Sequence, residues 1–227
     1  MSADLRLILF DVDGTLVDSQ ADIVASMTAA FHHVGLTAPD RAKILSIVGL
    51  SLPCAMAELA PNATSDTHSA MVEAYKRSYM QLRAAAGSEK SSPLYPGVRD
   101  LLDQLSATPE HLLGVATGKS QRGLDALIDG HGLQSMFLTR QCADHHPSKP
   151  HPSMILEAMS ETGVTPAQTV MIGDTSFDME MARAAGVFAI GVSWGYHPVD
   201  RLGAAHCIVD QVNALPAALD QIWRLAS

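Results

Sequence analysis

Short, continuous apolar runs recur along the chain and predict strands that are buried on both faces. They cover residues 5–10, 112–116, 136–139, 169–172 and 187–192. Between the later runs, apolar residues recur at three- and four-residue spacing, which predicts helices over residues 97–105, 152–159, 177–185 and 213–225. Strands that alternate with helices in this way predict an α/β fold with a parallel sheet and right-handed crossovers.

The segment between the first two predicted strands shows only helical patterns. Ser19 followed by Asp22 is typical of a capping box, and Ile23, Met27 and Phe31 continue at four-residue spacing. The polar stretch at residues 88–93 predicts a hinge. We therefore expect residues 1–15 and 94–227 to form the sheet domain, with residues 16–93 inserted after its first strand as a helical domain.

Composition and charge narrow the class of protein. The chain has 227 residues, of which 47% are hydrophobic and only 5% aromatic, so the core must be aliphatic. The net charge of −9 argues against a nucleic-acid partner, which would require a basic surface. A small anionic ligand remains compatible with this charge, because the local potential of a cleft can oppose the net charge.

The sequence also contains features that predict where in the cell the protein is found. The apolar residues 7–10 are too few for a signal peptide, and no run approaches the roughly 18 apolar residues of a membrane span. Three cysteines give no disulfide framework. We expect a cytoplasmic protein with no membrane partner. A monomer and a homodimer both remain open.

Polar side chains follow the predicted strands where the strands end, and ligands of parallel sheets bind at that edge. The residues concerned are Asp11, Asp13, Thr117, Lys149, Asp174 and Asp178. Carboxylates gathered at one edge favour Mg²⁺, which binds through one or two carboxylates together with water and phosphate. An ammonium and a hydroxyl suit phosphate. The set predicts metal-assisted phosphoryl transfer with an aspartate nucleophile.

Four short motifs resemble, in order, those of the haloacid dehalogenase-like hydrolase superfamily. They are Asp11-Val-Asp-Gly-Thr-Leu-Val-Asp18, Ala116-Thr117-Gly118, Lys149-Pro-His-Pro152 and Gly173-Asp174-Thr-Ser-Phe-Asp178-Met. The whole chain resembles most the phosphoglycolate-phosphatase-like branch, in which a helical cap follows the first strand. The resemblance implies a Rossmann-like sheet of order 3-2-1-4-5. It also implies a magnesium-dependent phosphatase that acts on a small phosphorylated metabolite.

The resemblance assigns a role to each motif residue. Asp11 would attack phosphorus and form an aspartyl-phosphate, and Asp13 would act as acid and then base. Asp11, Asp174 and the main-chain carbonyl of Asp13 would hold Mg²⁺. Asp178 would either join them or orient Lys149. The phosphate would be bound by Thr117, Gly118, Lys149 and the N–H groups that Gly14 exposes as it turns the chain.

Other functions compete with the phosphatase hypothesis. A sugar phosphomutase has a similar layout, although Gly173-Asp174-Thr resembles the phosphatase motif. Dehalogenation needs neither Asp13 nor Asp174. A non-catalytic binding relative stays open. A zinc site from Cys142, Asp144, His145, His146 and His151 fits no closed four-ligand spacing.

The expected substrate to test first is 2-phosphoglycolate. Free N–H groups of residues 48–51, where a helix begins at Ser51, could face its carboxylate. Leu50 and Leu52 make that loop apolar, so a sugar phosphate or a nucleoside monophosphate stays open. Lys119 is expected at the solvated surface, with attraction of a phosphorylated substrate toward the cleft as the alternative. Tyr196 is expected to pack within its loop, with a place in the wall of the active site as the alternative.

Overall fold

The computed structural model describes residues 5–225, so residues 1–4 and 226–227 of the predicted sheet domain lie outside the described part. Six strands, all paired in parallel, form one sheet of order β3-β2-β1-β4-β5-β6. The strands are β1 (Arg6–Phe10), β2 (His111–Thr117), β3 (Thr139–Cys142), β4 (Thr169–Gly173), β5 (Phe188–Val192) and β6 (Cys207–Val209). This confirms the α/β class and the predicted order, and it adds β6 at one edge.

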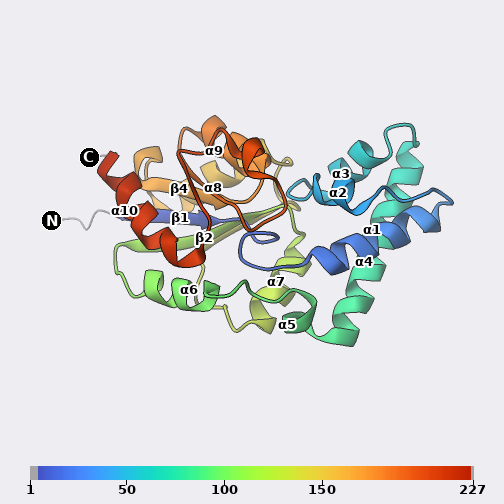
Figure 1. The fold of residues 1–227 in the computed structure, drawn as a ribbon, viewed down its shortest axis with the longest axis horizontal. Helices are drawn as coiled ribbons and strands as arrows, with labels where there is room; N and C mark the ends of the chain where they lie inside the picture. The colour runs from blue at the N-terminus through green and yellow to red at the C-terminus, as the bar shows by residue number, and fades with distance from the viewer. Residues whose placement is uncertain (1–4, 226–227) are drawn as a thin grey trace.

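Helices cover both faces of the sheet, as Figure 1 shows. One face carries α6 (Val98–Ser106), α7 (Gln121–Gly130) and α10 (Leu215–Leu225), and the other carries α8 (Ser153–Thr162) and α9 (Ser176–Ala185). Successive residues of a strand point to opposite faces. In β1, Ile8 and Phe10 therefore join the first hydrophobic cluster, and Leu7 and Leu9 join the second. Burial on both faces explains why the strand is apolar throughout.

Four of the remaining α-helices lie beyond the carboxyl ends of the strands, to the right in Figure 1, and the shortest one lies beside α7. The remaining α-helices are α1 (Gln20–His33), α2 (Arg41–Leu45), α3 (Leu52–Leu59), α4 (Ser65–Ala86) and α5 (Ser88–Ser91). Helices α1 to α4 bury a hydrophobic cluster of their own, which includes Ile23, Met27 and Met71. We call α1 to α5 the cap helices, and the boundaries at residues 16 and 93 stay a prediction.

Two linkers join the cap helices to the sheet, and they run side by side. The Asp18 N–H donates to the Pro93 carbonyl at 2.9 Å, and the Tyr95 N–H donates to the Leu16 carbonyl at 3.0 Å. The predicted hinge at residues 88–93 is not an open coil. It contains the short helix α5, and its Ser91 and Ser92 are buried.

One predicted strand differs from the structure. The strand expected at residues 136–139 begins only at Thr139, because Phe137 packs into the core from the preceding loop. The polar residues of β3 are instead stabilised by hydrogen bonds, such as the one from Gln141 to Thr139 at 2.8 Å.

No helix in the described part of the chain is long and apolar enough to cross a membrane.

Candidate active site

Three buried aspartates meet at the carboxyl edge of the sheet. Asp11 follows β1, Asp174 follows the neighbouring β4, and Asp178 lies in the first turn of α9. Each offers a carboxylate oxygen within 4.8 Å of the others. The strand pairing extends to the site itself, because the Asp11 N–H donates to the Ile172 carbonyl at 2.9 Å. The sheet therefore brings together side chains that are 163 and 167 positions apart.

Lys149 neutralises part of this charge. Its Nζ lies 2.8 Å from Asp11 Oδ1 and 2.6 Å from Asp178 Oδ1, and its side chain is fully buried. Burial alone would lower the pKa of Lys149, but the charges of Asp11 and Asp178 outweigh burial and raise it. The other oxygen of Asp178 accepts hydrogen bonds from the N–H and the hydroxyl of Thr175, at 3.1 and 2.6 Å. Asp178 therefore contacts Lys149 through one oxygen and Thr175 through the other.

Asp11 keeps one oxygen free. Its Oδ2 is buried and has no hydrogen-bond partner among the described residues. Burial raises the pKa of Asp11 to about 7, the Lys149 charge lowers it, and the Asp178 charge adds to the rise. A buried polar atom without a partner is costly, so its presence indicates a ligand or a reaction. The free lone pairs of Oδ2 suit an electrophile or a cation.

Among the residues that the structure describes, Asp174 has only neutral hydrogen-bond partners. Its Oδ1 accepts from the Thr15 hydroxyl at 2.9 Å, and its Oδ2 accepts from the Tyr196 N–H at 2.8 Å. Burial and then the charges of Asp11 and Asp178 raise the pKa of Asp174 well above its usual value. Three carboxylates thus face one ammonium, and the donor set fits a hard divalent cation such as Mg²⁺.

Gly14 turns the chain as predicted, but its own N–H is not available to bind phosphate. Its N–H donates to the Val17 carbonyl at 2.9 Å, so that donor is not free to bind phosphate. Its φ of +89° and its place against the Asp174 carboxylate both require a residue without Cβ. Gly14 therefore lets the chain turn closely around Asp174.

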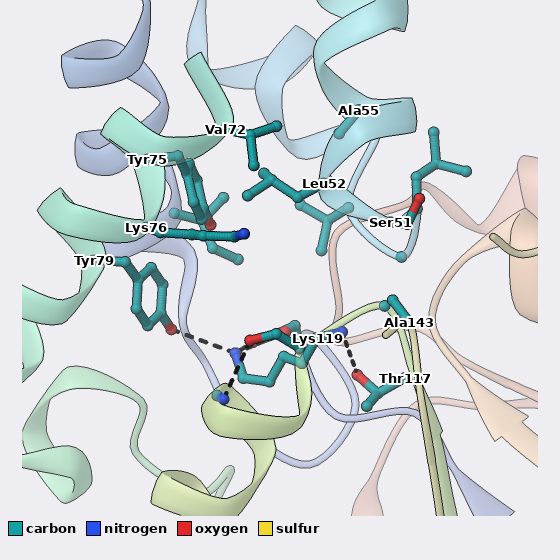
Figure 2. Close-up of a pocket in the computed structure, with 18 of the residues that line it drawn as sticks. Ser51, Leu52, Ala55, Val72, Tyr75, Lys76, Tyr79, Thr117, Lys119 and Ala143 are labelled. Atoms are coloured by element: carbon teal, nitrogen blue, oxygen red, sulfur yellow. Dashed lines mark hydrogen bonds and ion pairs between the residues drawn. The ribbon is translucent and has the colours of Figure 1, made fainter. Parts of the chain in front are cut away.

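Asp13 lies apart from the three clustered aspartates. Its two carboxylate oxygens lie 2.7 and 2.8 Å from Lys119 Nζ, and Oδ1 also accepts from the Ser19 hydroxyl. The expectation of a solvated Lys119 was wrong, since its side chain is only 11% exposed. Burial would lower the pKa of Lys119, but the Asp13 charge outweighs burial and raises it. Lys119 also lies 3.4 Å from the Tyr79 hydroxyl of α4, as Figure 2 shows.

Two more residues near Asp13 differ from their predicted roles. Ser19 starts α1 without a capping box, because its hydroxyl is used by Asp13. Tyr196 does more than pack within its loop: its hydroxyl accepts from the Ser19 N–H at 2.9 Å, and its own N–H binds Asp174. Both contacts join segments distant in sequence, so no local pattern could have indicated them.

Thr117 and Gly118 complete the carboxyl edge at the end of β2. Thr117 is buried, and its Oγ1 accepts from the Lys119 N–H at 3.2 Å. Gly118 lies directly beneath the loop between α2 and α3. A Cβ at Gly118 would lie 2.6 Å from the Gly49 carbonyl oxygen and 2.7 Å from that of Leu50. The cap helices thus approach the core backbone closely at this point.

The same loop was expected to offer free N–H groups, and this expectation was wrong for three of its residues. The Ser51 N–H donates to the Ser148 hydroxyl at 2.8 Å. The N–H groups of Val48 and Leu50 donate to the carbonyls of Leu45 and Ile47, both at 3.2 Å. The loop is therefore a cap-to-core contact, with Ser148 next to Lys149.

A cavity of about 500 Å³ lies between this edge and the cap helices. Asp11, Asp13, Thr117, Gly118 and Lys119 line its core side. Figure 2 shows α3 and α4 on the other side, with Leu52, Val72 and Tyr75 turned toward the space above Lys119. The cavity therefore has one side lined by oxygen-rich residues of the core and one largely apolar side lined by the cap helices.

The alternative zinc site is not assembled. The ring nitrogens of His146 lie 2.8 Å from Ser153 Oγ and 2.8 Å from Gln141 Oε1. Cys142 donates to Gln121. Within residues 5–225, the group of candidate metal ligands is the one formed by Asp11, Asp174 and Asp178.

Comparisons with known proteins find similar sequences and similar folds. The family model described as haloacid dehalogenase-like hydrolase matches residues 8–192. A protein of Dickeya dadantii named "Probable phosphatase IndB" is 37% identical, over 97% of this chain and 96% of its own. A phosphoglycolate phosphatase of Chromobacterium violaceum is 34% identical, over 88% of this chain and 90% of its own. A solved β-phosphoglucomutase of Clostridium difficile shares the fold, with a TM-score of 0.83 and 20% identity over 97% of this chain and 98% of its own.

Proposed function

The chain belongs to the haloacid dehalogenase-like hydrolases and is a phosphatase of that superfamily, and we propose that it hydrolyses small phosphate monoesters through a phosphorylated Asp11. One observation carries the proposal. Asp11 is buried, its Oδ1 is held by Lys149, and its Oδ2 has no partner among the described residues. An oriented carboxylate with one free oxygen is what in-line attack on phosphorus requires.

The donor set suits Mg²⁺. Asp11, Asp174 and the main-chain carbonyl of Asp13 would hold the ion, and Asp178 would act through Lys149. When bound, Mg²⁺ supplies positive charge that neutralises the phosphate and the carboxylates. The excess of buried negative charge around Asp174 supports this assignment.

In the first step, Asp11 Oδ2 forms a bond to phosphorus while the bond from phosphorus to the ester oxygen breaks. Asp13, in its protonated form, gives its proton to the departing oxygen, and the alcohol leaves. The Lys149 ammonium, the Thr117 hydroxyl and the Gly118 N–H would bind the phosphoryl oxygens. Thr117 and Gly118 line the core side of the cavity, and Lys149 contacts Asp11, which lines it too.

In the second step, water attacks the phosphorus of the aspartyl-phosphate and Asp13 takes a proton from that water. The bond from phosphorus to Asp11 Oδ2 breaks, which releases inorganic phosphate and restores the carboxylate. Asp13 regains the proton it gave in the first step, so the enzyme returns to its starting state.

The proposed reaction does not identify the alcohol part of the substrate. A relative that is 34% identical is named a phosphoglycolate phosphatase, which makes 2-phosphoglycolate the reference substrate. The test measures phosphate release from 2-phosphoglycolate and para-nitrophenyl phosphate, with Mg²⁺ and with excess chelator. We expect release only with Mg²⁺. No release from any ester would support the non-catalytic alternative, and conversion of a hexose phosphate to an isomer would support the mutase.

A further inference from the structure

The cavity above Asp11 is larger than a phosphorylated two-carbon acid needs. Its volume of about 500 Å³ lies in the range that holds drug-sized ligands, roughly 300–1,000 Å³. At about 30 Å³ per water-sized group, 2-phosphoglycolate would fill about half of it. The remaining space lies away from the aspartates, toward the cap helices.

That remaining space has an apolar wall. Leu50, Leu52, Val72, Tyr75 and Tyr79 all line the cavity and are only partly buried. Each packs on the hydrophobic cluster of the cap helices with one side, and its other side faces the cavity, as Figure 2 shows for the four of them that it labels. Partly exposed apolar side chains gathered around one cavity favour an apolar ligand group.

Two of these side chains are aromatic and parallel. The rings of Tyr75 and Tyr79 stack with centroids 5.9 Å apart and an angle of 25° between their planes. Both extend from α4 toward the space above Lys119 (Figure 2). Aromatic faces contact planar rings well, in offset-stacked or edge-on arrangements.

Two of the four cations that line the cavity already have carboxylate partners. Lys119 is paired with Asp13, and Lys76 lies 3.0 Å from Glu73. The N–H groups of Val48, Leu50 and Ser51 already donate to other groups. Arg83 and the exposed Arg122 are the other cations that line the cavity. A second carboxylate would thus depend on these two arginines, whereas the apolar wall itself suits an apolar ring.

We infer that the preferred substrate is a phosphate monoester whose alcohol carries a planar ring, and that Leu52, Val72 and Tyr75 of the apolar wall contact this ring. The inference rests on the proposed phosphatase activity. The phosphate would lie at Asp11 and Thr117, and the ring would lie beneath α3 and α4.

The first test compares kcat/KM among 2-phosphoglycolate, ribose 5-phosphate, pyridoxal 5′-phosphate and a pyrimidine nucleoside 5′-monophosphate. The nucleotide differs from ribose 5-phosphate only in the planar base that its sugar carries. We expect at least one ring-bearing ester to exceed both others by about tenfold or more. Equal or better hydrolysis of 2-phosphoglycolate or ribose 5-phosphate would overturn the inference. Failure of every ester would instead overturn the proposed function.

The second test enlarges one side chain of the apolar wall, which leaves less room in the cavity beside it. Val72→Phe places a larger side chain in the cavity, and Val24→Phe makes the same change in α1, at a residue that packs on the cap cluster without lining the cavity. We expect Val72→Phe to lower the preference for the ring-bearing ester over 2-phosphoglycolate about tenfold, and Val24→Phe to leave this ratio unchanged. An unchanged ratio in Val72→Phe would contradict the inference, and the wild-type comparison remains decisive if that variant does not fold.

Discussion

Two lysines at the carboxyl edge of the sheet each bind different carboxylates. Lys149 holds the Asp11 and Asp178 carboxylates, and Lys119 holds that of Asp13. Each ammonium is buried, so each pair is shielded from the water that weakens surface ion pairs. The lysines therefore set the positions of the proposed nucleophile and of the proposed general acid independently.

Lys119→Met tests the second of these tasks. Without the ammonium, Asp13 keeps the Ser19 hydroxyl but loses both contacts to Nζ, so its carboxylate is no longer fixed toward the leaving oxygen. We expect kcat to fall roughly 10- to 100-fold, within the usual contribution of general acid catalysis. Lys43→Met, which removes an exposed lysine paired with Glu58, is the matched control. Equal kcat values in the two variants would rule out a positioning role for Lys119.

The residues that sequence could predict and those it could not differ in a physical way. Asp11, Thr117 and Asp174 directly follow or end strands, and parallel strands bring their ends to one edge. That these three residues lie close together therefore follows from the local sequence pattern and the sheet topology. The partnership of Lys119 with Asp13 depends on a side-chain conformation across 106 positions, which no local periodicity encodes.

At the scale of elements, the cap helices contact the core at separate points. The loop between α2 and α3 lies on Gly118, and the Ser51 N–H binds Ser148. A further contact joins His197 Nε2 to the Ser46 carbonyl at 2.9 Å. These contacts close the cavity over the aspartates, and their separation would admit substrate and release product.

Gly118→Ala tests the close approach of the loop. The added methyl group would meet the carbonyl oxygens of Gly49 and Leu50 at 2.6 and 2.7 Å, and backbone atoms cannot move aside as a flexible side chain can. We expect kcat/KM to fall about tenfold or more, because the loop is displaced from the cavity.

Gly203→Ala is the control for this change. Gly203 has a φ of −60° and no atom within 4 Å of its hypothetical Cβ, so alanine fits there without strain. Wild-type kcat/KM in Gly118→Ala would mean that the loop need not contact the core during turnover.

Sequence located most elements but missed their less regular parts. Buried strands such as β1 and β4 have continuous apolar runs, and their predicted bounds differ from the structure by one residue. The strands β3 and β6 lie at the edges of the sheet, where one is polar and the other has only three residues. Edge strands carry weak periodicity, and β6 therefore had no detectable pattern.

At the scale of the whole molecule, the chain has a net charge of −9 and gathers three of its carboxylates in one buried site. Binding of Mg²⁺ there would relieve their repulsion in the folded state only. We expect Mg²⁺ to raise Tm in a concentration-dependent way and to be required for activity. Ca²⁺ should inhibit, because it takes a larger and looser ligand shell.

Thermal unfolding with Mg²⁺, with Ca²⁺ and with excess chelator measures the binding, and phosphate release under the same conditions measures the activity. Asp174→Asn removes one of the proposed ligand charges and should weaken the Mg²⁺-dependent rise in Tm. Full turnover in excess chelator would mean that the aspartates do not work through a metal.

The central claim is that Asp11 is phosphorylated during turnover. A single-turnover reaction, quenched in acid and followed by peptide mass mapping, measures this directly. We expect one phosphoryl group on the peptide that contains Asp11, with more of it in Asp13→Asn, where the base for its hydrolysis is lost. Asp11→Asn should show no label, a native circular dichroism spectrum and a rate lower by roughly a thousandfold or more. Wild-type phosphate release from Asp11→Asn, or turnover with the label on another residue, would contradict the account.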